Sequence, residues 1–307
     1  NNIYKAYLPR DMINIALGAV QFGMKYGVSN QAGQTEKYEV KKILEYASEK
    51  GINIIDTAPS YGDSEIAIGD SILGYGNNKY WNVVTKTPNF KVNAIENKHI
   101  DKLLENFYLS RVKLKQKIIY GLLVHNCDDL FLPGGEKIFS TMEALKKEGL
   151  VKNIGVSVYN GEQIDRLLDK YSIDLVQLPI NILDQRLMNS GRLSRLKELN
   201  VEIHARSAFL QGLLLMPINS IPFWFKPILK VLDEFHFEAK KRRMSVLELA
   251  FGFVHNINEI DKVVVGVNTL EQLHQIIEVM PLKVNIRDFS SLSISDKNFL
   301  NPSNWRI

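Results

Sequence analysis

Short runs rich in Val, Ile and Leu alternate with longer segments of helical period along the whole chain of 307 residues. Eight such runs begin at Ile13, Ile52, Trp81, Ile118, Asn153, Ile173, Val201 and Lys262. Runs such as "KVVVGV" from Lys262 are continuously apolar, which is typical of strands buried on both faces of a parallel sheet. Between the runs, segments such as "EKYEVKKILEYASEKG" (residues 36–51) place apolar side chains at helical spacing. Because eight such units favour a closed barrel over an open sheet, the sequence predicts an α/β fold, a single (β/α)8 TIM barrel.

The chain shows no internal boundary. No shift in composition and no linker rich in Pro, Gly or Ser divides it, and the segment "PINSIPFWFKP" (residues 217–227) is interpreted as a loop insertion. Since barrels of this kind take about 200 to 400 residues as one unit, we expect one domain over residues 1–307. The first residue is Asn rather than Met, so we expect that the natural N-terminus either was trimmed or follows an upstream segment.

Composition excludes several functional classes. The chain is 45% apolar and 23% charged with a formal net charge of +4, as in ordinary soluble globular proteins. Its basic residues are scattered except at Lys240–Arg243, which we interpret as a solvated helix face, so neither nucleic acid nor membrane is an expected partner. The single cysteine, Cys127, excludes an internal disulfide, and no H-x-H or H-E-x-x-H spacing predicts a metal. With no apolar run of about 18 residues and no signal peptide, we expect a cytoplasmic protein.

Polar side chains stand at the ends of three successive predicted strands. Asp56 ends the second run and Tyr61 follows shortly after it, Lys86 ends the third run and His125 ends the fourth. Each alone has an ordinary structural explanation, but the carboxyl ends of barrel strands are where such folds carry their active sites. A lysine at the end of a buried strand needs a counter-ion, so Asp56 and Lys86 are expected to form an ion pair. The cation is expected to lower the pKa of the Tyr61 phenol and to make it a tuned general acid.

This order of residues resembles the aldo-keto reductase family. Members have an Asp and a Tyr after the second strand, a Lys ending the third and a His ending the fourth, matched here by "DTAPSYG", "VVTK" and "LLVHN". The resemblance continues through "EGLVKNIGVSVYN", "VQLPINILDQR", "ARSAFLQGLLL" and "VVVGVNTLEQL", and covers essentially the whole chain. It implies an NAD(P)H-dependent oxidoreductase that reduces an aldehyde or ketone to an alcohol, or catalyses the reverse oxidation. In such a site Tyr61 protonates the carbonyl oxygen, His125 polarises it, and Asp56 and Lys86 set the acidity of the tyrosine.

The resemblance also implies where the cofactor binds, because no G-x-G-x-x-G motif is present to hold a dinucleotide in the Rossmann manner. The implied contacts are Ser157, Gln177, Arg206, Ser207, Phe209, Gln211, Gly212, Gly266, Asn268, Thr269 and Gln272. Ser157 and Gln177 are expected at the nicotinamide carboxamide, although a helix cap would also explain Ser157. Arg206 stands where many relatives have an aromatic residue that stacks on the nicotinamide, and its planar guanidinium could stack instead. The start of the last helix is expected to favour a phosphate.

The preference between NADP and NAD stays open. Relatives that prefer NADPH usually have Lys or Arg near the start of the last helix, where this chain has Asn268 and Gln272. A 2′-phosphate that faces neutral donors loses its charge-assisted hydrogen bonds. We therefore expect a preference for NADPH and a preference for NADH with about equal odds.

The loops around the site should shape a pocket for a small carbonyl or polyol substrate. Phe22, Tyr26, Asn126 and Trp224 are the candidate substrate contacts, although the aromatic cluster around Trp224 is also explained by packing within its loop. Polar side chains after His125 would suit a hydroxylated, sugar-derived carbonyl compound. Cys127 has no activating partner in the sequence and is interpreted as incidental, and His204 and His255 are interpreted as structural.

Two other functions remain open. A hydrolase on the same barrel would need further carboxylates or histidines at the strand ends, and the sequence has few. A cofactor-binding regulatory or sensor protein with little turnover would keep the barrel and the cofactor site, and the four filled catalytic positions argue against it.

Overall fold

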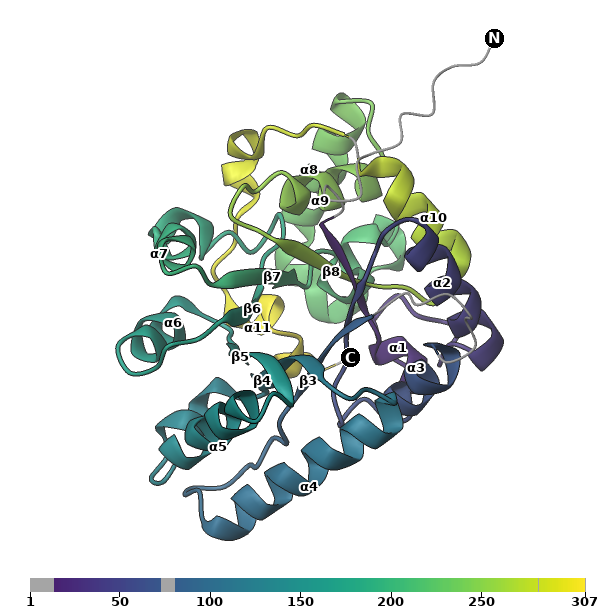
Figure 1. The fold of residues 1–307 in the computed structure, drawn as a ribbon. Helices are drawn as coiled ribbons and strands as arrows, with labels where there is room; N and C mark the ends of the chain where they lie inside the picture. Colours follow the sequence, from purple (N-terminus) through teal and green to yellow (C-terminus); the bar gives the residue numbers. More distant parts are fainter. Residues whose placement is uncertain (1–13, 73–80, 281, 307) are drawn as a thin grey trace.

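The computed structural model describes residues 14–72, 81–280 and 282–306. Its strands are β1 (Ile15–Gly18), β2 (Ile54–Asp56), β3 (Asn82–Lys86), β4 (Ile119–Val124), β5 (Val151–Ser157), β6 (Leu175–Pro179), β7 (Glu202–Arg206) and β8 (Lys262–Gly266). They pair in parallel in chain order, and β8 pairs with β1 to close the barrel (Figure 1). The predicted (β/α)8 TIM barrel is confirmed, and a strand overlaps each of the eight apolar runs, although β5 begins two residues before the predicted start at Asn153. Ile13, the first residue of the first run, lies outside the described residues.

Helices surround the barrel (Figure 1). They are α1 (Val20–Gly23), α2 (Lys37–Glu49), α3 (Ser64–Ile72), α4 (Asn97–Leu114), α5 (Glu136–Lys147), α6 (Gly161–Leu168), α7 (Arg192–Glu198), α8 (Leu229–Lys241), α9 (Val246–His255), α10 (Leu270–Val279) and α11 (Lys297–Leu300). The segment predicted as the first long helix forms α2, and the chain leaves it at Gly51, whose φ of +85° suits a residue without a Cβ. Both α8 and α9 lie between β7 and β8, so this unit is longer than the simple strand-and-helix repeat that the sequence indicated.

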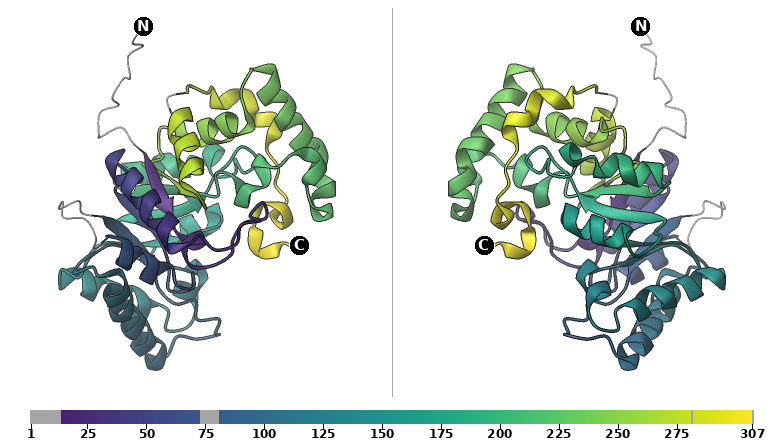
Figure 2. Two further views of the ribbon diagram at one scale, coloured as in Figure 1. Left: turned by 90° about the vertical axis from the view of Figure 1, so that its right-hand side faces the viewer. Right: turned by 90° about the vertical axis from the view of Figure 1, so that its left-hand side faces the viewer.

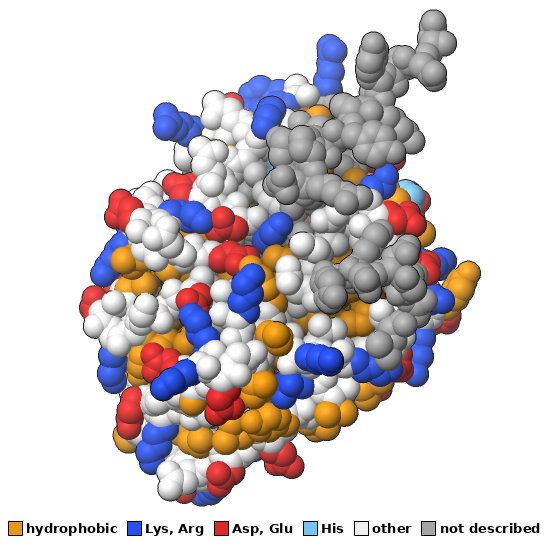
Figure 3. Space-filling view, in the orientation of Figure 1, with side chains coloured by type: hydrophobic (Ala, Val, Ile, Leu, Met, Phe, Trp, Pro, Cys, Tyr) orange, Lys and Arg blue, Asp and Glu red, His pale blue; other side chains and the backbone are white. Residues whose placement is uncertain are grey.

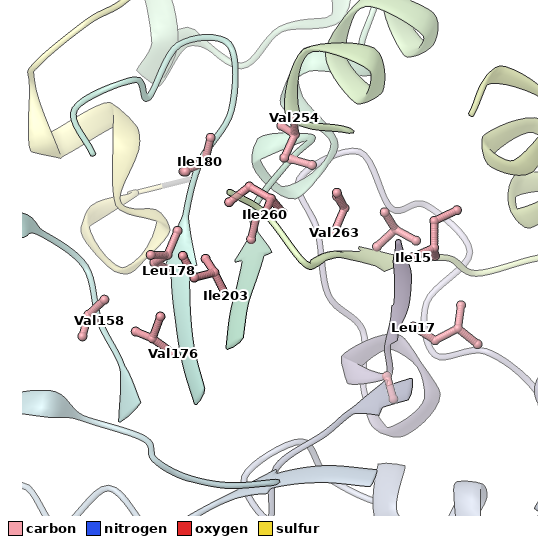
Figure 4. Close-up of a cluster of buried hydrophobic side chains, with 14 of the residues drawn as sticks. Ile15, Leu17, Val158, Val176, Leu178, Ile180, Ile203, Val254, Ile260 and Val263 are labelled. Atoms are coloured by element: carbon pink, nitrogen blue, oxygen red, sulfur yellow. The ribbon is translucent and has the colours of Figure 1, made fainter. Parts of the chain in front are cut away.

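The core lies mainly between the strands and the surrounding helices. Side chains such as Ile15, Leu17 and Val263 alternate along their strands and pack outward, and Val254 of α9 meets them from outside (Figure 4). The barrel interior holds a second, smaller cluster formed by Ala16, Ile54, Val84, Leu123 and Leu175. Because these side chains fill the interior, the inward-facing polar side chains that could do chemistry lie at the ends of the strands.

The C-terminal segment folds back along one side of the barrel (Figure 2). Ile294 donates a backbone hydrogen bond to Leu183 at 2.9 Å. The Trp305 ring meets the Phe225 ring edge to face, with 4.8 Å between their centres. The tail therefore packs on the segment η6 (Phe223–Ile228), which lies in the long connection between β7 and β8.

Charges of both signs are interspersed on the face shown in Figure 3. Lys240, Lys241 and Arg243 at the end of α8 are exposed, as expected for a solvated helix face.

Apolar side chains gather on the outer surface of α4, where Tyr108, Leu109 and Val112 are exposed by 45, 47 and 71%. Within the described ranges, no helix combines the length and the apolar character that a membrane crossing requires.

Candidate active site

The ends of β2 and β3 hold a buried ion pair. Lys86 Nζ donates to both carboxylate oxygens of Asp56, at 2.8 and 2.9 Å, and to the backbone oxygen of Thr57 at 2.8 Å. The Lys86 and Asp56 side chains are exposed by only 1 and 6%. An ammonium group has three N–H donors, and all three are satisfied here. The ion pair that the sequence predicted is confirmed.

Strand register explains why the two groups meet. Asp56 pairs with Val84 and Lys86 pairs with Leu123 in neighbouring parallel strands. Asp56 and Lys86 therefore end adjacent strands at the same rim of the barrel, and residues two apart along a strand face the same side. A long lysine side chain that follows Val84 on the inner face of β3 reaches the carboxylate next to it.

Tyr61 stands in the turn between β2 and α3. Its ring centre lies 5.0 Å from Lys86 Nζ and 6.1 Å from the centre of the His125 ring, which is nearly perpendicular to it. The turn is held by close backbone packing, because a Cβ on Gly23 would lie 1.8 Å from the Tyr61 carbonyl oxygen. Gly62 has a φ of +56°, and a Cβ on it would lie 2.3 Å from the Gly23 carbonyl oxygen. The two glycines fix the tyrosine between the cation and the imidazole.

The expected lowering of the Tyr61 pKa is wrong. Burial raises the pKa of Tyr61 above its usual value, and the opposing effect of Lys86 is the smaller of the two. Burial alone would lower the pKa of Lys86, but Asp56 and Tyr61 outweigh it and raise that pKa. The sequence shows the neighbouring cation but not the loss of solvent around the phenol, which has the larger effect. The Tyr61 phenol is therefore neutral at physiological pH.

His125 completes the cluster as a neutral imidazole. Burial, together with the charge of Lys86, lowers the pKa of His125 to about 4. Its Nδ1 atom is buried and has no partner among the described residues. A neutral imidazole beside Tyr61 can orient a polar substrate atom without competing with the phenol as an acid.

A further contact to Asp56 was not expected. Gln177, at the inner face of β6, donates from Nε2 to Asp56 Oδ1 at 2.8 Å and is 2% exposed. The sequence argument had placed Gln177 at the nicotinamide carboxamide. One N–H of its amide is engaged by the ion pair, so the amide oxygen and the second N–H remain for a ligand. Nothing in the local sequence relates residues 121 positions apart, so only the barrel register reveals this contact.

A cavity of about 430 Å³ opens at the carboxyl ends of the strands. The expected site residues that line it are Tyr26, Asp56, Tyr61, Lys86, His125, Ser157, Gln177, Arg206, Ser207, Phe209, Gln211, Gly212, Gly266, Asn268 and Gln272. The structure thus brings together the four candidate catalytic residues and nearly all the candidate cofactor contacts. Tyr26 reaches the cavity because its hydroxyl accepts a hydrogen bond from Gln211 Nε2 at 2.9 Å.

Four of the expected contacts lie away from this cavity. Phe22 is fully buried in the core below the loop, and Asn126 donates its amide to Asp129 at 2.7 Å. The Trp224 ring packs near Phe299, which supports the packing explanation of that aromatic cluster. Thr269 caps α10 by accepting the backbone N–H of Gln272. Phe22, Asn126 and Trp224, which were predicted to contact the substrate, therefore do not line this cavity, because core packing and local hydrogen bonds hold them elsewhere.

The structure adds cavity residues that sequence reasoning missed. Among them are Gln21, Ser29, Asn30, Tyr159, Leu247 and Gln275. Gln21 and Tyr159 follow the first and fifth strands closely, so the rule that active sites stand on such loops could have found them. Gln21 Oε1 is buried with no partner among the described residues, and a Cβ on Gly266 would lie 2.6 Å from the Gln21 amide.

The cavity wall carries polar atoms that are available to a bound dinucleotide. Two unpartnered polar atoms, Gln21 Oε1 and His125 Nδ1, belong to residues that line it. Buried polar atoms of this kind are usually paired with protein, water or a ligand. The segment after β7 is irregular, with positive φ values at Ser207, Gln211 and Gly212, so it does not continue as a regular helix. Among the described residues, no cluster of three or more His, Cys, Asp or Glu side chains is arranged to hold a metal ion.

The start of α10 differs from the expected phosphate site. The backbone N–H of Asn268 donates to Gln272 Oε1 at 2.7 Å, and that of Leu270 donates to Glu39 Oε1 of α2 at 2.7 Å. The Asn268 amide donates to the Gly33 carbonyl at 3.1 Å. Side chains of the protein thus already satisfy donors that the sequence argument had assigned to a phosphate, and one of them is a carboxylate.

Arg206, at the end of β7, lies on the cavity wall. Its Nη2 donates to the Val158 carbonyl at 3.1 Å and its Nη1 to Ser207 Oγ at 3.4 Å. The guanidinium carbon lies 4.4 Å from the centre of the Tyr159 ring, a distance typical of a cation–π contact. Within the described part of the chain, no carboxylate forms an ion pair with Arg206.

Comparison with known proteins gives a consistent result over the chain. The sequence model of the "Aldo/keto reductase family" matches residues 14–297. The NADH-specific methylglyoxal reductase of Escherichia coli (strain K12) is 23% identical over 278 residues, which are 81% of this chain and 84% of that protein. The holo form of the aldo-keto reductase AKR11C1 from Bacillus halodurans has a TM-score of 0.70 at 18% identity and covers 91% of both chains. The glycerol dehydrogenase AKR11B4 from Gluconobacter oxydans has a TM-score of 0.67 at 21% identity, over 93% of this chain and 94% of that one.

Proposed function

Because the chain belongs to the aldo/keto reductase family, we propose that this oxidoreductase reduces an aldehyde or ketone with Tyr61 as the proton donor, or catalyses the reverse oxidation. The buried Asp56–Lys86 pair beside Tyr61 and His125, at the wall of a cavity, is the observation that carries the proposal. Enzymes of this family use NAD(P)H, which supplies the hydride that reduces the carbonyl carbon. The residues of this chain supply the proton, the orientation and the charge environment.

Tyr61 holds the proton that the carbonyl oxygen receives. The raised pKa of Tyr61, caused mainly by burial, keeps the phenol protonated before the reaction. As the oxygen gains negative charge the proton moves to it, and the phenolate that remains is stabilised by the Lys86 ammonium, whose Nζ lies 5.0 Å from the ring centre. Positioned proton transfer of this kind typically contributes about 10²–10⁴-fold in rate.

His125 has the role of an orienting donor. With its pKa lowered to about 4 by burial, the imidazole stays neutral over the physiological range. A neutral imidazole can donate one hydrogen bond to the carbonyl oxygen and so stabilise the charge that develops there. Asp56 acts indirectly by holding Lys86 in place, and Gln177 in turn holds Asp56.

We further propose that the enzyme accepts NADH at least nearly as well as NADPH. Among the described residues that line the cavity, the Lys and Arg side chains are Lys86, which ends β3, and Arg206, which ends β7. The part of the cavity wall after β8, at Asn268 and Gln272, has neutral side chains, and the Glu39 carboxylate lies at the start of α10. A 2′-phosphate there would have no cation and would face a nearby anion. The NADH specificity in the name of the Escherichia coli relative agrees with this proposal.

The substrate is proposed to be a small hydroxylated carbonyl compound, such as one derived from a sugar, or a polyol in the reverse direction. Hydroxyl and amide groups of Tyr26, Tyr159, Asn30 and Gln211 line the cavity, and they can hydrogen-bond to hydroxyl groups of a ligand. The relatives named as methylglyoxal reductase and glycerol dehydrogenase act on small oxygenated molecules, which is compatible with such a pocket.

The test is a titration followed by a substrate panel. NADH and NADPH are added to the purified protein, and their fluorescence reports binding; small aldehydes, ketones and polyols are then added and the absorbance of the reduced nicotinamide is followed. We expect binding and turnover, with turnover lost in Tyr61→Phe. Binding without turnover of any carbonyl or polyol would instead support a cofactor-binding sensor, and absence of binding would contradict both functions.

A further inference from the structure

The cavity contains one cation with no counter-ion among the described residues. Lys86 is neutralised by Asp56, with two contacts shorter than 3 Å. Arg206 has only neutral partners, the Val158 carbonyl and Ser207 Oγ. A partly buried cation without a carboxylate gives this part of the wall a net positive charge, and it is less screened than a charge on an open surface.

Arg206 is held firmly in this position. Its guanidinium rests on the Tyr159 ring at 4.4 Å while Nη2 donates to Val158. The two contacts come from the same segment after β5, so they fix both the plane and the edge of the guanidinium. The side chain therefore does not need to order itself when a ligand arrives, and its charge acts from a defined place.

The positive charge acts on the reacting end of the cavity. The same guanidinium influences the rings of Tyr61, His125 and Tyr26: it opposes the effect of burial, which raises the pKa of Tyr61 and Tyr26, and it adds to burial and Lys86 in lowering the pKa of His125. All three rings line the cavity together with Arg206.

The reaction itself brings the nicotinamide to this place. In the proposed reduction, the carbonyl carbon receives the hydride and the oxygen bonded to it receives the Tyr61 proton. Reacting atoms must approach to about 3–3.5 Å, so the hydride-donating ring has to lie within a few ångströms of the Tyr61 hydroxyl. Because Arg206 lines the same cavity and its charge acts on Tyr61, any productive pose puts the ring within reach of that charge.

The two forms of this ring differ by one charge. The reduced nicotinamide is neutral, whereas the oxidised ring carries a positive charge. We propose that Arg206 is a specificity-determining residue that makes the site bind the reduced cofactor more tightly than the oxidised one. This inference rests on the proposed function, since it requires the cofactor to bind in this cavity.

The consequence is a bias between the two half-reactions. After a carbonyl is reduced, the oxidised cofactor faces an uncompensated guanidinium and leaves easily, which favours repeated reduction. In the reverse direction, binding of NAD⁺ is penalised before any polyol reacts. Two unit charges a few ångströms apart at an effective dielectric constant of about 20 interact strongly enough to change affinity more than tenfold, even after partial screening.

The experiment measures dissociation constants for NADH and NAD⁺ by calorimetry, without substrate, in the wild type, Arg206→Met and Arg206→Lys. Lys152→Met is the matched control, because it removes one positive charge from β5 near the Tyr120 ring and not from the cavity lining. We expect Arg206→Met to lower the ratio of the NAD⁺ to the NADH dissociation constant by about tenfold or more, chiefly through tighter NAD⁺ binding. Arg206→Lys, which keeps the charge, and Lys152→Met should each leave the ratio within about twofold.

Salt provides a second readout on the same samples. The ratio in the wild type should fall as ionic strength is raised, and the ratio in Arg206→Met should not. If Arg206→Met does not fold, as checked by circular dichroism, Arg206→Gln gives the same test with a polar side chain. An unchanged ratio in the neutral variant, with both cofactors still bound, would overturn the inference alone. Failure of the wild type to bind either cofactor would overturn the inference and the proposed function together.

Discussion

Replacing Lys86 by methionine should leave a buried carboxylate without its cation. Asp56 is only 6% exposed at its side chain, and after the change its remaining side-chain hydrogen bond comes from Gln177. Breaking a buried ion pair by removing one partner typically costs about 3–5 kcal/mol. Because Gln177 still donates one hydrogen bond to Asp56, we expect the unfolding free energy to fall by about 3 kcal/mol, the lower end of that range.

A second change separates the cost of the orphaned charge from the cost of the lost lysine. In Lys86→Met with Asp56→Asn, the side chain at position 56 is neutral and keeps an oxygen that can accept the Gln177 hydrogen bond. We expect the double variant to regain most of the stability, to within about 1 kcal/mol of the wild type. Its turnover should stay at least about a hundredfold below the wild type, because the cation beside Tyr61 is still absent.

The measurement is urea unfolding followed by circular dichroism, together with the rate of carbonyl reduction. A pH series adds a check, since an unpaired buried carboxylate has a raised pKa in the folded protein. The deficit of Lys86→Met relative to the wild type should therefore shrink as the pH falls and the carboxyl group takes up a proton. If the double variant were less stable than Lys86→Met alone, the stranded charge would not be the source of the loss, and the reasoning would be refuted.

Three further changes test other parts of the site and the fold. Tyr61→Phe should lower kcat by at least about a hundredfold while both cofactors bind within a few-fold of the wild type, as measured by steady-state kinetics and fluorescence titration; more than about a tenth of the wild-type kcat would contradict the proton-donor role. Asn268→Arg should tighten NADPH by about 1–3 kcal/mol at low salt and leave NADH nearly unchanged, and a wild-type preference for NADPH of about a hundredfold would show that another cation fills this role. Glu65→Gln should raise the melting temperature at pH 7, because burial raises the pKa of Glu65 and so penalises its charged form once the pH exceeds the ordinary glutamate value. That gain should vanish in melting curves recorded below the ordinary pKa of a glutamate, where the folded and unfolded carboxyl groups are both protonated.

The barrel and the ion pair could be predicted because both follow from burial along single strands. A strand buried on both faces has a continuous apolar sequence, so each apolar run indicated a strand. The polar residue at the end of a run indicated the end of the barrel where the active site lies. A lysine in such a position needs a carboxylate on a neighbouring strand, and Asp56 was the group that the chain order supplied. These inferences need only the sequence and the parallel order of neighbouring strands.

Features that depend on loops could not be obtained in the same way. Phe22 and Trp224 looked like pocket residues because they are aromatic and stand after strands, yet the core and Phe299 hold them. The pKa of Tyr61 was predicted in the wrong direction because the sequence shows the neighbouring lysine but not the extent to which the turn around Gly62 excludes solvent from the phenol. Both differences depend on how the segments between strands fold over the end of the barrel. The hydrophobic periodicity of the sequence does not encode this.

The start of α10 shows how a distant residue can alter the chemistry of a local motif. The sequence "NTLEQ" contains its own cap, since Thr269 accepts the Gln272 amide hydrogen and the Gln272 side chain accepts that of Asn268. The Leu270 amide would remain free for an anion, but Glu39, 231 positions earlier in the chain, accepts its hydrogen at 2.7 Å. A carboxylate at a helix N-terminus is stabilised by the helix dipole, so α10 is satisfied without a phosphate. The proposed acceptance of NADH thus has two physical sources, the neutral side chains that the sequence shows and an acidic contact that only the packing of α2 against α10 creates.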